Sequence, residues 1–269
     1  MRDSAESTRV KGLVQRAELG GWEVPEPILL AIAKEQSLRA ALTDTNRRLG
    51  ARPDLLGELT EAVTDAGTVP PALTQRIGAL HTEQEALKQQ ANLLTMVVEQ
   101  AQERVVGAAQ THAEDIITKH LRPALAEVLA VVRKHAPAAG NIPWDDFDKA
   151  MEAPEAEREA YLAIRAANNR YAALRTAQEV CYWLTVGENE GTQRFSEIRN
   201  LHEVWPSYAF RQPGNIPPWP KNPMARLVWL VTSRAKPWMP TYEEIEAEFL
   251  ARRAAAAPDI SESTAYLPR

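Results

Sequence analysis

Residues 73–112 read LTQRIGALHTEQEALKQQANLLTMVVEQAQERVVGAAQTH and decide the fold. Apolar residues recur in this stretch at alternating spacings of four and three positions for nearly six heptads. Chance rarely sustains such a register so far, so the pattern predicts a coiled-coil helix. We call its apolar core positions the seam; they are Leu73, Ile77, Leu80, Leu87, Leu94, Val98 and Val105.

The long helix is expected to begin at Pro70-Pro71, because proline is tolerated in the first turn of a helix. After His112 the register slips, and a shifted pattern from Ile117 to Val131 carries the helix to about Ala136. Pro123 lies inside this part and should kink it, since proline removes one backbone hydrogen bond. A helix over 70–136 would be about 100 Å long at ~1.5 Å per residue, so it needs a partner to cover its apolar positions.

A second heptad pattern runs from Ala160 to Cys181, after a helix start at Pro154. We expect it to fold back on the long helix as an antiparallel helical hairpin. This second arm is about half as long as the first. Part of the seam is therefore left for the N-terminal helices or for another chain.

The remaining segments read as short helices and irregular chain. Helices are expected over 25–50 and 53–66, and again over 242–253, with little or no strand anywhere. The chain divides on this basis into short N-terminal helices (1–67), a long helical hairpin (68–187) and a C-terminal arm rich in proline and tryptophan (188–269). The fold class is all-α.

The C-terminal arm holds the most unusual composition. Eight of the chain's 19 prolines and four of its 7 tryptophans lie in 194–240, which carries a local charge of +5 from seven basic and two acidic residues. Tryptophan and arginine are enriched at the energetic centres of protein interfaces, which favours docking onto another protein. Aromatic residues mixed with basic ones also suit binding of single-stranded nucleic acid. Alternatively, the segment folds back over the helices and its tryptophans fill gaps in a thin core. These three interpretations stay open. The predicted partner-docking residues are Trp205, Arg211, Trp219, Lys221, Trp229 and Trp238.

Trp219 is the most specific of the docking candidates. It lies between Pro218 and Pro220, where the backbone is stiff and the ring is presented at little entropic cost. We expect it to insert into a pocket on a neighbouring chain. If it is instead buried against residues 73–186 of its own chain, the arm is a cover for the core.

Polar residues of the helices are weak candidates for chemistry. His112, His120 and His135 lie along the long helix and would need a further ligand from elsewhere to bind a metal. The plain interpretation is that His112 is a polar residue of the heptad core and that the other two are solvated. Cys181 falls in the second heptad pattern, where a small packed side chain is the plain interpretation. Gln84 interrupts the seam and either specifies register or reaches water.

Three aspartates, Asp145, Asp146 and Asp148, form an acidic cluster after Pro143-Trp144. Oxygen ligands of this kind can hold calcium or magnesium. Aspartates at a helix start also satisfy free backbone N–H groups, which suffices to explain them. No cofactor or metal is therefore expected, and no recognised catalytic motif is present in the sequence.

Composition points to a soluble protein inside a cell or a virion. The net charge of −5 argues against a chain built to coat nucleic acid. A lone cysteine, Cys181, fits a reducing compartment, and neither a signal peptide nor a transmembrane run is visible. We expect a cytoplasmic protein, or a virion component assembled in the host cytoplasm.

In general organisation the chain resembles minor structural proteins of tailed phages that infect actinobacteria. The resemblance rests on an alanine- and arginine-rich helical chain, the heptad stretch from Leu73 to His112, and the aromatic-proline arm from Trp205 to Pro240. It implies a non-enzymatic virion component bound to capsid, portal or other copies of itself, and it transfers no residue roles. The other hypothesis is a helical regulatory or nucleic-acid-associated protein, in phage packaging or host defence, that uses the basic segment 194–240.

Overall fold

The computed structural model describes residues 4–51, 71–140, 142–187, 197–205 and 216–256, with positions 57, 60, 61 and 64. Helix accounts for 83% of these residues, and no strand occurs among them beyond one isolated antiparallel bridge between Ile198 and Pro237. The predicted all-α class is confirmed. Within the described ranges, no helix combines the length and apolar character needed to cross a membrane.

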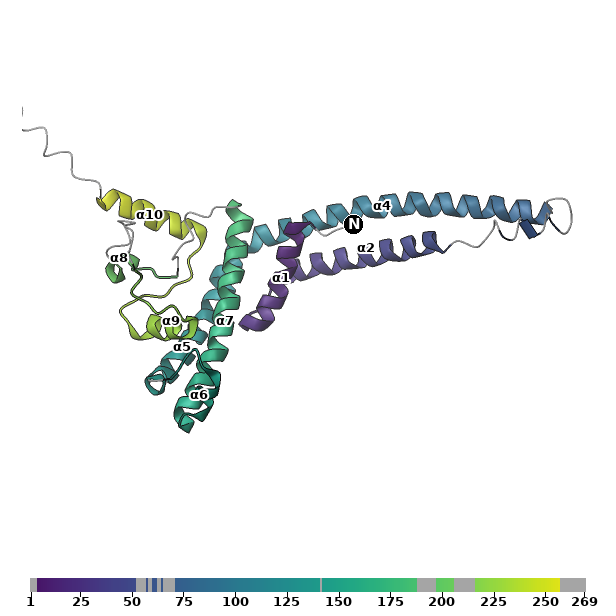
Figure 1. Cartoon of the computed structure of the whole chain (residues 1–269). Coiled ribbons are helices and arrows are strands. Elements are labelled where there is room, and N and C mark those ends of the chain that lie inside the picture. The colour runs from purple at the N-terminus through teal and green to yellow at the C-terminus, as the bar shows by residue number, and fades with distance from the viewer. Residues whose placement is uncertain are drawn as a thin grey trace, which may run out of the picture. The chain divides into compact units, whose positions relative to one another are not determined.

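Figure 1 labels the helices in their order along the chain. Four of the elements are continuous and form one long helix of 69 residues. These four are α4 (Pro71–Asp115), the π-helix η1 (Ile116–Leu121), α5 (Arg122–His135) and the 3-10 helix η2 (Ala136–Ala139). The other helices are α1 (Ala5–Gly20), α2 (Glu26–Gly50), α6 (Phe147–Glu152), α7 (Glu155–Val186), α8 (Leu201–Val204), α9 (Pro223–Thr232) and α10 (Tyr242–Ala256).

The chain forms two compact units. The first comprises Met1–Thr8 and Glu26–Ala108, and the second comprises Arg9–Pro25 and Ala109–Arg269. These units divide the chain differently from the three sequence segments, because one division falls inside the long helix. A long helix changes partners along its length, and the change of partner defines the unit.

In the first unit, α2 is the partner of the heptad stretch of α4. Leu42 of α2 packs in one apolar cluster with Ala91 and Val98 of α4. The two helices run antiparallel, since Arg48, near the end of α2, forms an ion pair with Glu83 early in the heptad stretch (3.6 Å). The heptad seam is thus covered by an N-terminal helix, whereas the second arm of the hairpin meets the long helix further along the chain.

All seam residues are buried or half-buried. Leu87, Val98 and Val105 are buried, and Leu94 is half-buried against Leu42. The first seam residues of α4 are also half-buried, although α2 ends at Gly50. They are Leu73, Ile77, Leu80 and the polar Gln84.

The slip in register after His112 is a π-helical turn, η1. The N–H of Arg122 donates to the carbonyl of Ile117, five residues back, in place of the usual four. One extra residue in the turn rotates the apolar face, so that Ile116, Ile117 and Leu121 are all buried. Pro123 follows this turn directly. Its missing N–H removes one backbone hydrogen bond at a point where the wider turn has already changed the bonding pattern of the helix.

The second unit is built on the hairpin of α5 and α7, which lie side by side with α6 at the connection (Figure 1). Buried residues of α7, among them Ile164 and Leu174, face this core. Helix α1 runs antiparallel along α7, because Arg9 stacks on Trp183 at one end and Arg170 bonds to the carbonyl of Gly20 at the other. The arm adds α9, which packs on both α5 and α7.

Candidate docking surfaces

Three of the four tryptophans in 194–240 gather into one cluster inside their own chain. Trp219 lies against Trp205 (ring centroids 5.4 Å apart) and Trp229 (5.6 Å), with Arg226 over its face at 5.0 Å. Its side chain is only 8% exposed. The expectation that Trp219 inserts into a neighbouring chain is therefore wrong: the ring is buried among side chains of the arm itself.

The other docking candidates are distributed over the same unit. Trp205, Trp229 and Trp238 are half-buried, and Lys221 is exposed. Arg211 lies outside the described residues. The three clustered rings contact one another within the arm, and helix α9, which carries Trp229, packs on α5 and α7.

A polar network ties the arm to α7. Arg226 forms an ion pair with Glu197, whose carboxylate also accepts a hydrogen bond from the hydroxyl of Tyr171 (2.8 Å). Arg175 stacks on Tyr171 at 5.0 Å. Desolvation lowers the pKa of the Arg226 guanidinium from its ordinary value. Part of the arm's positive charge is thus already paired within the protein.

Residues 238–240, which we call the strap, cross the hairpin in an extended conformation. Three successive carbonyls are each bound by side chains of the hairpin: Trp238 by Arg175 (2.9 Å), Met239 by Arg122 (2.8 Å) and Pro240 by Gln178 and Tyr182 (2.9 and 2.6 Å). Extended backbone has no internal hydrogen bonds, so these side chains supply the missing partners. Burial raises the pKa of Tyr182 above its ordinary value and keeps the hydroxyl a donor.

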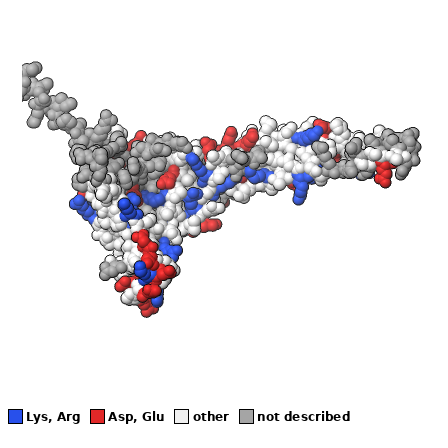
Figure 2. All heavy atoms as spheres, in the orientation of Figure 1, with Lys and Arg blue, Asp and Glu red and all other residues white. Residues whose placement is uncertain are grey.

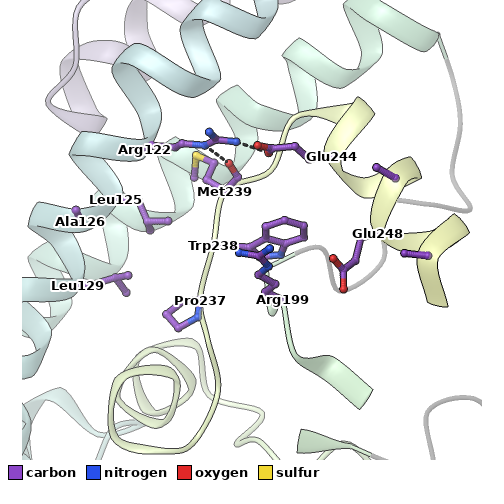
Figure 3. A pocket seen from close by; sticks show the side chains of 12 residues that line it. Arg122, Leu125, Ala126, Leu129, Arg199, Pro237, Trp238, Met239, Glu244 and Glu248 are labelled. Carbon is purple, nitrogen blue, oxygen red and sulfur yellow. Dashed lines mark hydrogen bonds and ion pairs between the residues drawn. The ribbon is translucent and has the colours of Figure 1, made fainter. Parts of the chain in front are cut away.

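The strap leads into α10 through a capping box. The Thr241 hydroxyl accepts from the N–H of Glu244 (3.2 Å), and the Glu244 carboxylate accepts from the N–H of Thr241 (2.9 Å). The same carboxylate forms an ion pair with Arg122 (Figure 3). One glutamate therefore both starts α10 and fixes it to the hairpin.

A pocket of about 590 Å³ opens between α5, the strap and α10. Leu125, Ala126 and Leu129 form one wall, and Glu244 and Glu248 rise from α10 opposite (Figure 3). Two charged side chains of the pocket already make structural contacts. Arg122 donates to the Met239 carbonyl of the strap, and the Arg199 guanidinium stacks on Trp238 at 5.4 Å. The lining residues offer apolar and ionic contacts to whatever enters the pocket.

The acidic cluster lies at the turn of the hairpin, where carboxylates gather around α6 (Figure 2). Asp146 caps α6 by accepting from the N–H of Lys149 (3.1 Å), and the Lys149 ammonium lowers the Asp146 pKa. Asp145 accepts from the side chain of Asn222, which itself caps α9. Helix capping thus accounts for Asp146, and a hydrogen bond to a capping residue accounts for Asp145. No group of three metal-binding side chains occurs in the described ranges.

The histidines and the cysteine are dispersed. His112, His120 and His135 are half-buried at separate points of the long helix, and His120 lies 6.4 Å from the ring of Trp22. Cys181 is fully buried, and this burial raises its pKa to about 12, which keeps the thiol protonated and unreactive.

The first unit exposes large apolar side chains that sequence reasoning missed. Leu93 and Met96 of α4 are 64% and 60% exposed, and Val97 and Leu30 are also exposed. Beside them Leu30, Ala31 and Lys34 of α2 line a groove with Ala101 and Arg104 of α4. The signal was present in the sequence, because Leu93 and Met96 lie off the seam, where charged residues are expected on a solvated helix.

Comparison with known proteins adds no assignment. No family model matches the chain, and neither a curated protein nor a solved structure does.

Proposed function

We propose that this chain is a non-enzymatic structural protein that assembles with other protein chains, as a minor component of a phage virion. The exposed apolar surface of the first unit carries the proposal. There Leu93, Met96 and Val97 follow one another on α4 without cover from α2. Contiguous exposed apolar side chains on a helix mark an interaction surface.

The construction of the unit supports the same conclusion. Two paired helices bury only the seam between them, so most of each helix remains at the surface. Small helical assemblies gain stability by burying further faces against other helices. A chain of this kind is suited to association.

The second unit supports a scaffold rather than an enzyme. The charged side chains around its pocket hold the backbone: Arg122 binds the strap and Glu244 caps α10. The tryptophan cluster likewise packs within the arm, whose helix α9 lies on the hairpin. We therefore assign docking to the α2–α4 pair and not to the arm.

The resemblance to minor structural proteins of actinobacterial phages supports the virion assignment and names the partners to test. These are capsid, portal or further copies of this chain. In this proposal the protein is made in the host cytoplasm and leaves it within the particle.

Native fractionation tests the proposal. Lysate and purified particles from the source are separated by sedimentation, and the wild-type chain is located by peptide mass spectrometry. We expect it in fractions far heavier than its own 29.9 kDa, before and after nuclease treatment. Sedimentation as a free monomer in the source would overturn the proposal, and loss of the heavy form on nuclease treatment would favour nucleic-acid association.

A further inference from the structure

Helix α4 carries a second heptad row on a face that α2 does not cover. We call it the outer row. Its members alternate spacings of four and three, as the seam does, and all are exposed. They are Gln75, Ala79, Thr82, Ala86, Gln89, Leu93, Met96 and Gln100. At ~1.5 Å per residue the outer row is about 38 Å long.

The outer row contains no charged residue, although charged residues such as Glu85, Lys88 and Glu99 occupy other faces of the same helix. A helix face that remains in water is normally rich in charge, and one that packs on another helix is not. Thr82 also suits burial, because its hydroxyl already donates to the carbonyl of Gly78 (3.0 Å). The chemistry is that of a second packing face.

Absence of charge makes a second copy of this chain a compatible occupant. Two copies that meet through an uncharged surface bring no like charges together. Glutamine amides both donate and accept, so a glutamine can pair with its own counterpart. Gln75 and Gln100, at the two ends of the row, have this property.

The order of side-chain sizes sets the direction of pairing. Apart from Gln75, the first half of the row consists of small residues, and the second half consists of large ones. An antiparallel pair centred between Leu87 and Lys88 places Ala79 opposite Met96 and Thr82 opposite Leu93. It also places Ala86 opposite Gln89, and Gln75 opposite Gln100. Large residues then face small ones, which is how helical cores fill space, whereas a parallel pair would set like against like.

We propose that two copies of this chain pair antiparallel through their outer rows, so that two α2–α4 pairs form one four-helix assembly. This inference deepens the proposed assembly function and rests on it, by naming a second copy as the partner of α4. The seam keeps each α2–α4 pair together, and the outer row joins the two pairs.

Sedimentation equilibrium of the purified full chain tests the pairing. We expect a dimer for the wild type in the micromolar range, and a monomer of unchanged helix content for Leu93→Glu/Met96→Glu. The matched control is Asn92→Glu/Gln110→Glu, which adds the same charges at exposed positions off the row and should remain dimeric. A monomeric wild type would overturn the inference, and so would a dimer that both variants retain.

Cross-linking tests the direction. Ala79→Cys and Met96→Cys are made as separate chains of different tag length and mixed under mild oxidation. A disulfide needs Cα atoms within about 7 Å, so the antiparallel register predicts the mixed 79–96 product. The native Cys181 is buried and does not compete. Self-linking of Met96→Cys alone would overturn the antiparallel register.

The two levels of the proposal fail separately. If the purified chain is monomeric but the source chain sediments in a heavy complex, the assembly function stands and self-pairing is wrong. If the chain is monomeric in both, the assembly function is wrong as well.

Discussion

A few side chains of the arm and of the hairpin hold the segments of the second unit together. Trp219 joins Trp205 and Trp229 in one cluster, and a single arginine, Arg122, binds both the strap and Glu244. Each of these side chains joins segments that are far apart in sequence. Substitutions here should therefore affect the stability of the second unit.

Trp219→Ala should lower the melting temperature and leave self-association unchanged. Removing a buried tryptophan creates a cavity that costs about 3–5 kcal/mol. Thermal unfolding followed by circular dichroism measures the loss, and Trp219→Phe should lose less because it refills part of the space. Weaker association with an unchanged melting temperature would show that Trp219 docks on a partner chain.

Burial of the Cys181 thiol predicts that the free energy of unfolding falls at alkaline pH. Its folded pKa of about 12 exceeds the ordinary value of 9.0, because burial disfavours the thiolate. The contribution of the protonated thiol to the free energy of unfolding is fully present below pH 9. It is lost as the pH rises from 9 towards 12, at about 1.4 kcal/mol per pH unit. Tyr182, whose pKa is also raised by burial, adds a loss of the same sign above its ordinary value of 10.0.

Urea unfolding at a series of pH values from 8 to 11 measures this slope. Cys181→Ala removes the thiol and should show a shallower fall in the free energy of unfolding above pH 9 than the wild type. Equal slopes for the two proteins would show that the thiol is not the titrating group.

At the scale of elements, helix ends decide how the arm is attached. Asn222 caps α9 and also binds Asp145, and the Thr241–Glu244 capping box begins α10 directly after the strap. Because these residues lie between irregular segments, the caps determine where helix resumes. Helix α10 should therefore be sensitive to its cap.

Thr241→Ala should destabilise α10 by about 1 kcal/mol, the usual cost of losing a threonine cap. Hydrogen exchange resolved by mass spectrometry should show faster exchange confined to peptides of α10. Thr176→Ala, an exposed threonine inside α7, is the control and should leave α10 unchanged. Uniformly faster exchange across the unit would contradict a local capping effect.

At the scale of the whole molecule, α4 uses two faces for two tasks. The seam packs on α2 within the chain, and the outer row is exposed on the same helix. Substitution on the seam should therefore disturb folding of the first unit, whereas substitution on the outer row should disturb association alone.

Leu87→Asp should unfold the α2–α4 pair, because it places an unpaired charge at a buried position and removes a leucine, at a cost of more than about 3 kcal/mol. Circular dichroism should report a loss of helix. The matched variant Leu93→Asp, six positions along on the exposed face, should keep its helix content. Retention of full helix content by Leu87→Asp would show that the seam does not hold the unit together.

The sequence by itself determined the class, the seam and most helix ends, because these depend on local periodicity, proline and capping residues. The heptads from Leu73 predicted α4, and the 25–50 segment predicted α2. Only the tertiary structure decided that α2 covers the seam, since a heptad pattern states that a partner exists and not which one. The same limit applies to Trp219: its composition suits an interface or a core equally, and only contact with Trp205 and Trp229 places it in a core.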